Sequence, residues 1–553
     1  MKTLNADWWI GCGLLAWVSV TLAAEQPAAV VRLNSLGFLP DQIKQATLAT
    51  AATNFSVLRL ADGELVFQGP VKGPRTNADT GEPLYVADFS EFQGQGTFQL
   101  ALPGGEKSAP FAIGREVYED AFRTVMLGMY LWRCGAAVSA THNGTTFAHA
   151  ACHTNDAWLD YVGGGAVTRN ATGGWHDAGD YNKYVVNAAL TVGCMLRAWE
   201  DFSPAIRRIK LQVPEAADPL PQFLREVKWE LDWLFTMQAA DGSVYHKLST
   251  RDFGGFVLPE AETARRYFAP WSSAATAGFV AVMAQAARDF REFDAPFAER
   301  CRRAAERSRA FLEAHPESHR ADQSAFTTGA YPARDEEYRL WAAAELWATH
   351  GDTNDLADFE RRAAALPRAV DLTFDWGNPK NLGMLTYLAP GRKDKDSVLA
   401  GKIRDHLLAT ADEIVKVRDA HGYVRPLGTF YHWGGNGSVA RQTLVLQAAV
   451  RISPKPQYRQ TALDALGHLF GRNCYGRSFV TGLGANPPLH PHDRRSGADR
   501  IAEPWPGYLV GGPSRGATDW LDEQKDFRTN EIAINWNAAL IYALAGFLAG
   551  DRP

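Results

Sequence analysis

Cysteine and surplus charge are both scarce in this chain, and each scarcity excludes a class of protein. The 553 residues include six cysteines, of which Cys12 lies in the N-terminal apolar segment. The other five are an odd number, which argues against a full disulfide framework. The net charge of -5 is mild for this length and gives no sign of nucleic-acid binding. A hydrophobic content of 46% is that of an ordinary globular protein.

Long apolar runs are also lacking, with one exception at the N-terminus. Lys2 precedes a mostly apolar run over residues 8–24, and Thr21-Leu22-Ala23 offers the small residues that a signal peptidase needs. We expect residues 1–23 to be a signal peptide and the mature protein to be secreted or periplasmic. The alternative is an uncleaved membrane anchor, since the run approaches spanning length. No other segment is apolar enough to cross a bilayer, so no transmembrane domain is expected after signal removal.

No short sequence repeat is visible, but the hydrophobic pattern changes near residue 114. Before that point apolar residues alternate with others, as at Phe98, Leu100 and Leu102. Asp62-Gly63 separates two apolar runs, which is a hairpin signal. We therefore expect a small all-β sandwich over residues 28–114, within the normal size of such folds.

From residue 115 to residue 550 the pattern is mostly helical. Phe297, Cys301 and Ala304 follow helical spacing, and His315-Pro316 ends that run. Further helices are expected over residues 223–238, 339–348, 398–417, 438–451 and 531–548. Helices that alternate with long loops suit an α-toroid, although composition alone does not distinguish it from another helical fold.

The most informative motif is the turn at residues 174–181, which reads Gly-Trp-His-Asp-Ala-Gly-Asp-Tyr. Asp177 and Asp180 lie three residues apart, and the glycines let the backbone bend sharply. Two acids in a flexible turn, flanked by flat aromatic rings, suit a site that activates water beside a sugar. The alternative is an ordinary Asp-Gly turn with solvated acids.

A third acid, Glu531, opens the last apolar run. Thr529 or Asn530 is expected to be the N-cap of a helix that holds Glu531 in its first turn. Ile532 and Trp536 would then desolvate Glu531 and raise its pKa, as a general acid requires. A helix N-terminus has the opposite effect, because it favours the charged carboxylate. A Glu at such a position is also often only a capping residue.

Between these two motifs lies a Gly- and Pro-rich segment, residues 479–496, which should be an ordered loop and not a helix. It contains two histidines and two arginines, among them His492 and Arg494. A rigid loop that presents such donors suits the binding of sugar hydroxyl groups. The alternative is a surface loop with scattered charge.

Together the three motifs resemble glycoside hydrolase family 9, a cellulase family, in the branch with an N-terminal immunoglobulin-like module. The matching residues are Trp520, Asp522, Phe527, Glu531, Ala533, Asn537 and Ala538 in the C-terminal signature, and Gly482, Asn486, Pro487, His492 and Arg494 in the histidine loop. Asp493 stands where many members have a second histidine. The resemblance covers nearly all of the chain and implies an immunoglobulin-like sandwich followed by a large all-α (α/α)6 barrel.

The resemblance also implies a role for each site residue. Asp180 matches the base that deprotonates the attacking water, Asp177 its partner in holding that water, and Glu531 the general acid. The matching residues of the sugar-binding loop are His492 and Arg494. The candidates for stacking on the sugar, each equally a candidate wall of the barrel, are Trp433, Trp536 and Tyr184. A base and an acid on opposite faces of the sugar imply inverting hydrolysis, with carboxyl groups ~6.5–9.5 Å apart.

A metal site is expected beside the catalytic turn. Two thiolates and two imidazoles, a common set for structural zinc, come from Cys134, Cys152, His153 and His176. The resemblance implies zinc at the corresponding places. The alternative is a Cys134–Cys152 disulfide in an exported protein, but the neighbouring histidines would have no role in it.

Calcium is a second metal that the resemblance implies. The corresponding residues here are Thr328, Gly329, Asp335 and Glu337. Glu337-Tyr338 replaces the Asp-Glu pair of the family, which removes one carboxylate from the site.

For the substrate, the resemblance implies a β-glucan or cello-oligosaccharide, and we expect an endo-β-1,4-glucanase that acts as a monomer. One alternative is an exo-acting β-glucosidase, cellobiohydrolase or glucosaminidase of the same fold. Another is a non-catalytic carbohydrate-binding protein, against which the retained Asp177, Asp180 and Glu531 argue. No Ser/Pro-rich linker or separate cellulose-binding module is visible in the sequence, so a soluble glucan is the expected substrate.

Overall fold

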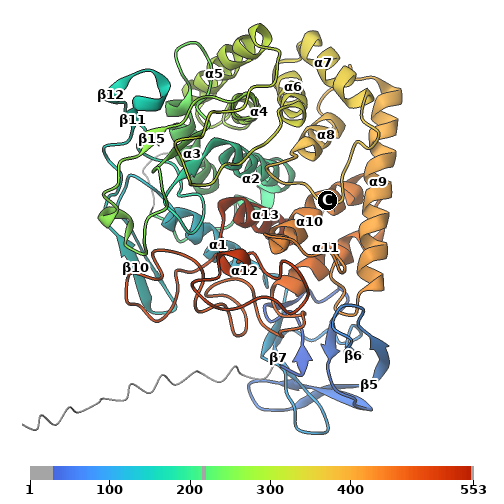
Figure 1. Ribbon diagram of the computed structural model, residues 1–553. Helices are drawn as coiled ribbons and strands as arrows, with labels where there is room; N and C mark the ends of the chain where they lie inside the picture. Colours follow the sequence, from blue (N-terminus) through green and yellow to red (C-terminus); the bar gives the residue numbers. More distant parts are fainter. Residues whose placement is uncertain (1–28, 215–218, 550–553) are drawn as a thin grey trace, which may run out of the picture.

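The computed structural model describes residues 29–214 and 219–549. An all-β module, with strands between Val31 and Ile113, is followed by a much larger ring of helices (Figure 1). Each part has its own cluster of buried hydrophobic side chains, as expected for units with separate cores. The expected signal peptide at residues 1–23 lies outside the described residues.

The N-terminal module consists of two sheets that share the long strand β5 (Leu65–Thr76). One sheet adds β1 (Val31–Arg32), β3 (Gln45–Leu48) and β6 (Pro83–Asp88), and the other adds β4 (Asn54–Arg59), β7 (Gly96–Ala101), β8 (Phe111–Ile113) and β2 (Gly37–Phe38). The predicted hairpin is present, because β4 and β5 pair in antiparallel fashion around Asp62-Gly63. Phe55, Phe98 and Phe111 are among the buried residues between the sheets.

The helical part is the expected (α/α)6 barrel. The inner helices are α2 (Val185–Ile206), α4 (Ser273–Asp289), α6 (Glu336–His350), α8 (Lys380–Leu388), α10 (Gly435–Ile452) and α13 (Ile534–Ala545). The outer helices are α1 (Glu119–Leu131), α3 (Gln222–Met237), α5 (Ala295–Ala314), α7 (Thr353–Ala364), α9 (Ser397–Ala420) and α11 (Pro456–Leu469). Because α13 packs against both α2 and α10, the last long helix closes the ring.

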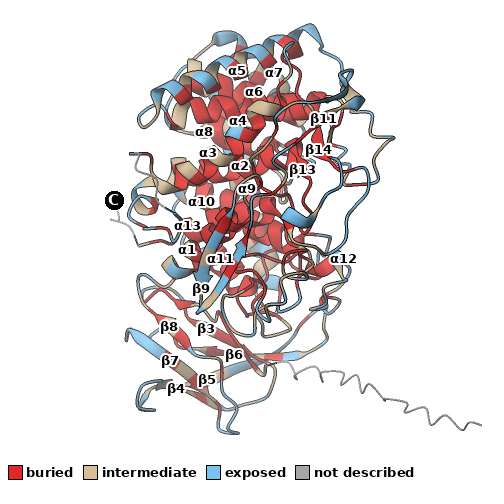
Figure 2. Ribbon diagram, turned by 90° about the vertical axis from the view of Figure 1, so that its left-hand side faces the viewer, coloured by how far each residue is buried: buried red, intermediate tan, exposed pale blue. Residues whose placement is uncertain are grey.

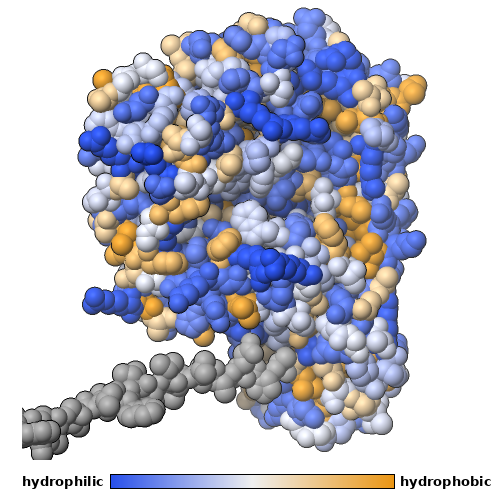
Figure 3. Space-filling view, viewed as in Figure 1, coloured by the Kyte–Doolittle hydropathy of each residue, from blue (hydrophilic) through white to orange (hydrophobic). Residues whose placement is uncertain are grey.

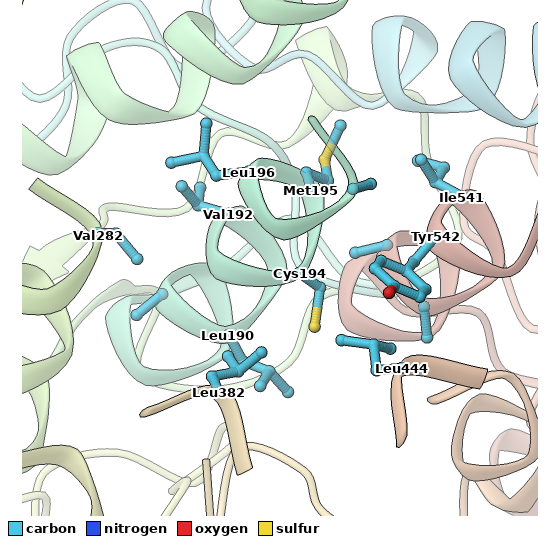
Figure 4. Packing of buried hydrophobic residues seen from close by; sticks show 14 of the residues in the cluster. Leu190, Val192, Cys194, Met195, Leu196, Val282, Leu382, Leu444, Ile541 and Tyr542 are labelled. Atoms are coloured by element: carbon cyan, nitrogen blue, oxygen red, sulfur yellow. The ribbon is translucent and has the colours of Figure 1, made fainter. Parts of the chain in front are cut away.

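The inner helices are buried around most of their surface, whereas outer helices such as α5, α7 and α9 keep an exposed face (Figure 2). Figure 4 shows the consequence for packing, since Leu190 and Cys194 of α2 approach Leu382 of α8, Leu444 of α10 and Tyr542 of α13. Burial of this much apolar surface is the main stabilising contribution to such a core. It also gives the loops at the end of the barrel a rigid base.

Short strands and helices support these loops. The strands are β9 (Val138–His142), β10 (Thr145–His149), β11 (Trp158–Leu159), β12 (Gly165–Thr168), β13 (Lys183–Tyr184), β14 (Lys247–Ser249) and β15 (Tyr267–Phe268). The short helices are η1 (Asp160–Val162), η2 (Pro259–Ala261) and α12 (Phe527–Asn530). Strands β11 to β15 form one sheet, so loops from distant parts of the chain are held together.

The β module contacts the connection between α9 and α10. His421 Nε2 lies 3.0 Å from Asp79 Oδ2, and the Tyr423 hydroxyl donates to Glu82 Oε2 at 2.6 Å. The face seen in Figure 3 mixes hydrophilic and hydrophobic residues. In the described part of the chain, none of the helices combines the length and hydrophobicity that a membrane span requires.

Candidate active site

The turn with the two aspartates is tied to several parts of the barrel. The Cys134 amide, just after α1, donates to the Gly174 carbonyl at 2.7 Å. The Ile534 amide at the start of α13 donates to the Asp177 carbonyl at 2.9 Å. Glu230 of α3 accepts from the Trp175 amide at 2.6 Å. The backbone on both sides of the acids is therefore fixed, which is the condition for precise catalytic geometry.

Two glycines of this turn are required by space. Gly174 has φ +72°, and a Cβ there would lie 2.8 Å from Trp233. A Cβ on Gly179 would overlap the carbonyl oxygen of His492. The sequence motif thus reflects close approach between the turn, α3 and the histidine loop as well as backbone flexibility.

Asp177 is buried and accepts two side-chain hydrogen bonds. Asn187 Nδ2 donates to Oδ1 at 2.8 Å, and the Tyr331 hydroxyl donates to Oδ2 at 2.5 Å. Burial, followed by the nearby charge of Asp180, raises the pKa of Asp177 to about 8, although both donors oppose this change. The surroundings of Asp177 thus disfavour its ionised form.

Asp180 lies in a more polar environment. Asn182 Nδ2 donates to its Oδ2 at 2.7 Å, and the Tyr184 hydroxyl donates to the same oxygen at 3.2 Å. Burial raises the pKa of Asp180, while the charge of Arg494 and these donors act in the opposite direction. The surrounding groups thus favour an ionised Asp180 more than an ionised Asp177.

Our expectation for the backbone of Glu531 was wrong. Glu531 is not in a helical turn but has extended geometry, with φ -72° and ψ 157°, after α12 and before α13. Its carbonyl accepts from the Gly511 amide at 2.9 Å, and it forms a parallel bridge with His492. Neighbouring loops occupy these backbone groups, so the helix starts at Ile534, and Thr529 and Asn530 belong to α12.

The surroundings of Glu531 favour its protonated form. The residue is partly exposed, but burial of its carboxyl group raises its pKa well above the ordinary value, and the charges of Asp180 and Asp177 add to the rise. Arg494 acts in the opposite direction. The opposing effect that we expected from a helix N-terminus does not apply at an extended residue.

His492 and Arg494 lie between the aspartate turn and the exposed side chains of Phe253 and Phe256. The Arg494 amide donates to the Gly179 carbonyl at 3.1 Å, and its guanidinium group lies over the ring of Tyr181. His492 Nδ1 lies 2.7 Å from the Gln524 carbonyl. Both residues of the histidine loop are thus next to the catalytic turn.

The three stacking candidates have different environments. Trp433 is 45% exposed, and its indole nitrogen donates to the Phe527 carbonyl at 3.3 Å. Trp536 is 2% exposed and covers Gly434 and Gly437, so it forms part of the wall. Tyr184 is equally buried, and its hydroxyl bonds to Asp180. Only Trp433 of these three presents a large accessible face.

Sequence reasoning missed Asn182, Asn187 and Tyr331. Tyr331 has φ +42°, a conformation that non-glycine residues rarely adopt and that is costly unless the surroundings enforce it. Its ring packs against Tyr184 and Trp376, with centroids 4.7 and 4.8 Å away. A strained tyrosine whose hydroxyl reaches a buried acid is a functional candidate.

Tyr331→Phe is expected to shift the acidic limb of the kcat/KM profile to higher pH. The hydroxyl stabilises the charged form of Asp177, so its loss raises the pKa of Asp177 further. Hydrogen bonds to charged groups contribute about 1.5–3 kcal/mol, so activity near pH 6 should fall about tenfold or more. Kinetics from pH 4 to 9 would measure this, with Tyr161→Phe as control. An unmoved limb would exclude a role for an ionised Asp177.

The four expected metal ligands form a cluster. The ligand atoms of Cys134, Cys152, His153 and His176 all lie within 4.8 Å of one another. Cys134 Sγ is 3.6 Å from His153 Nδ1, and Cys152 Sγ is 3.7 Å from His176 Nε2. Both cysteines are free thiols. Buried His176 Nδ1 has no hydrogen-bond partner among the described residues. A tight set of two thiolate and two imidazole donors fits a metal ion of the zinc type.

Three of the four residues expected for calcium already form hydrogen bonds with basic side chains. Lys247 Nζ donates to Thr328 Oγ1 at 3.1 Å and to the Gly329 carbonyl at 2.9 Å. Asp335 pairs with Arg339 at 2.6 Å. The oxygens of Thr328, Gly329 and Asp335 thus already interact with cationic side chains, whereas the buried Glu337 Oε2 has no hydrogen-bond partner among the described residues. Calcium needs six or more oxygen ligands.

Comparison with known proteins agrees with this geometry. The model of glycosyl hydrolase family 9 matches residues 118–544, and that of the cellulase N-terminal ig-like domain matches residues 26–107. Endoglucanase D of Acetivibrio thermocellus is 55% identical over 526 residues, which cover 95% of this chain and 84% of that protein. The chain belongs to glycosyl hydrolase family 9 and is a glycoside hydrolase with an N-terminal immunoglobulin-like module.

Solved structures show the same fold. The crystal structure of a metagenome-derived glycoside hydrolase family 9 endoglucanase has a TM-score of 0.88 at 33% identity, over 94% of this chain and 99% of that one. A Zn-binding triple mutant of the family 9 endoglucanase J30 has a TM-score of 0.86 at 31% identity, over 93% and 100% of the two chains.

Proposed function

We propose that this protein is an inverting endo-β-1,4-glucanase that acts on soluble β-glucans and cello-oligosaccharides. The observation that carries the proposal is the environment of three acids, Asp177, Asp180 and Glu531, around one turn. The surroundings of Glu531 favour its protonated form, whereas hydrogen-bond donors surround Asp180. Acid–base catalysis requires such a difference between the two groups. The 55% identity to an endoglucanase supports the endo mode.

In the proposed reaction Asp180 is the base and Glu531 is the acid. Asp180 takes a proton from a water whose oxygen attacks the anomeric carbon. The bond from that carbon to the leaving oxygen breaks, and Glu531 donates its proton to this oxygen. Asp177 holds the same water. Each turnover leaves Asp180 protonated and Glu531 ionised, and exchange with solvent restores both.

The assignment of acid and base follows from the neighbours of each carboxyl. Asn182 and Tyr184 donate to Asp180, and Arg494 adds a favourable charge, so these groups stabilise the ionised base. The charge of Asp180, and that of Asp177 when it is ionised, opposes ionisation of Glu531. A protonated donor facing an ionised acceptor is the starting state that the reaction needs.

We assign the sugar contacts to the histidine loop and to one exposed tryptophan. His492 and Arg494 are the polar candidates, and Trp433 is the stacking candidate, because aromatic faces suit the apolar face of a pyranose. Trp536 and Tyr184 support this site from the wall, in keeping with their burial.

We further propose that Cys134, Cys152, His153 and His176 hold one structural zinc ion. Bound zinc would constrain the catalytic turn, because His176 is the neighbour of Asp177. Four protein ligands leave no open position for water activation. Calcium is not part of the proposal.

We propose the export signal, the monomeric state and the domain boundaries as the sequence indicates them. Residues 1–23 would direct export, and the protein would act in a secreted or periplasmic form as a monomer. The immunoglobulin-like module would span residues 28–114 and the catalytic domain residues 115–550. Polar contacts such as His421–Asp79 would hold the two together.

Hydrolysis of cellohexaose is expected to release the α-anomer first, because one displacement by water inverts the anomeric centre. Proton NMR in the first minutes of the reaction would detect it. A β-anomer as first product would mean a covalent intermediate, and Asp180 would then be a nucleophile. On carboxymethyl cellulose the viscosity should fall early; glucose or cellobiose release without this fall would favour the exo alternative.

A further inference from the structure

A loop on the far side of the histidine loop exposes two large aromatic side chains. In the segment between β14 and β15, Phe253 is 52% exposed and Phe256 is 39% exposed. The Arg494 guanidinium carbon lies 5.7 Å from the ring centre of Phe253, and the His492 ring meets Phe256 edge-on at 5.4 Å. Two exposed aromatic rings next to a polar site mark a binding surface more than a random surface feature.

The catalytic site itself holds this loop in place. The hydroxyl of Tyr181, directly after the base, donates to the Val257 carbonyl at 2.5 Å. Arg494 Nη2 donates to the Gly254 carbonyl at 3.1 Å. The loop backbone is thus fixed relative to Asp180, so the exposed rings continue the surface that starts at the catalytic turn.

Glu262, at the end of the same segment, connects it with the Cys/His cluster. Its Oε2 lies 3.2 Å from His153 Nε2, and the two side chains are 6% and 3% exposed. A Cβ on Gly254 would lie 2.6 Å from Glu262 Oε1, so the other carboxylate oxygen lies directly against the loop backbone. One carboxylate therefore touches both the cluster and the loop that carries the phenylalanines.

The orientation of His153 supports this connection. Its Nδ1 faces Cys134 Sγ at 3.6 Å, and its opposite nitrogen faces Glu262. Metal-binding histidines almost always donate the second ring N–H to a carboxylate, a backbone carbonyl or a water, which fixes the ring and strengthens metal binding. Glu262 has the position of such a carboxylate.

We propose that residues 251–262 form a sugar-binding loop in which Phe253 and Phe256 contact the glucan chain and Glu262 is a positioning residue linked to the Cys/His cluster. This rests on the proposed function for the identity of the ligand, a β-linked glucan chain. The occupant follows from continuity, because the two rings adjoin His492 and Arg494. Metal occupancy then affects substrate affinity through this loop as well as through the catalytic turn.

The first test measures binding of cellohexaose by calorimetry in the full-length Glu531→Gln background. Phe253→Ala and Phe256→Ala should each weaken binding about tenfold, as truncation of a buried contact residue typically does. Leu65→Ala on β5, which removes an equally exposed side chain from the distant module, is the control. Binding equal to that of the control would overturn the role of the two rings.

The second test separates the positioning residue from a purely structural one. Glu262→Gln should weaken zinc affinity, measured by competition with a chelator, about 10–100-fold, and it should weaken cellohexaose binding. The matched control is Glu260→Gln, an exposed acid on the same segment. Phe253→Ala and Phe256→Ala should leave zinc affinity unchanged. If Glu262→Gln bound zinc and cellohexaose as tightly as Glu260→Gln does, this part of the proposal would be overturned.

These measurements are independent of turnover. If the unmodified protein bound cellohexaose but hydrolysed no β-glucan, the proposed reaction would fail while the loop remained supported. If it hydrolysed β-glucans and the loop variants bound sugar and zinc like their controls, the loop proposal alone would fail.

Discussion

Glu531→Gln is expected to lower kcat on cello-oligosaccharides by ~10²–10⁴-fold, the usual contribution of a general acid or base. The amide keeps the shape of the side chain but has no proton to give to the leaving oxygen. An aryl cellobioside with a good leaving group needs no such proton, so this substrate should recover much of the lost rate. The raised pKa of Glu531 is the physical reason for its role as proton donor.

Asp180→Asn is the comparison that makes this result specific. A better leaving group does not activate water, so the aryl substrate should not rescue this variant. Both variants should melt within a few degrees of the parent, since each exchange conserves volume. Turnover close to normal in either variant, or equal rescue of both, would disprove the assignment of acid and base.

Removal of the metal should have the second largest effect. Chelation, or Cys152→Ser, is expected to lower the melting temperature by about 5 °C or more, because zinc binding contributes directly to folding. Activity should fall as well, since Cys152 faces His176 and His176 adjoins Asp177. Calorimetry and turnover before and after chelation would measure both effects, and added zinc should restore them.

Cys474→Ser is the control, because Cys474 is a free thiol outside the cluster. Metal analysis should give one zinc per chain. If the purified protein contained no zinc and had a disulfide between Cys134 and Cys152, the proposed metal site would be wrong. The assignments of the three carboxyl groups would not change.

The sequence predicted helices of both rings, among them the outer α5 and the inner α6 and α10. In α5 the buried residues Phe297, Cys301 and Ala304 recur on one side, and the helix ends at Ala314, as the periodicity indicated. In contrast, α2 and α4 are buried on nearly every side and rich in small residues, so they have no polar face to create a period. The positions of α2 and α4 are determined by their packing against neighbouring helices of the barrel and not by a local sequence pattern.

Long-range contacts explain what the sequence did not predict at the site. The apolar run after Glu531 suggested a helix from its first residue, but residues 531–533 pair with His492, Val510 and Ala178, and these bridges keep the backbone extended. Tyr331 was missed for a related reason, because its partner Asp177 is 154 residues away. The motifs themselves pointed to the three acids as candidates, because each motif is short and local.

The closing position of α13 has a consequence for biosynthesis. The β module has a core of its own, so it can acquire its structure while the rest of the chain is still being translated. The barrel differs, because α2 and α10 gain their shared neighbour only when residues 534–545 have been made. Glu531 arrives at almost the same moment. A nascent chain therefore contains Glu531, the proposed acid, only shortly before it contains the helix that closes the ring, and the complete site forms only after that helix has been made.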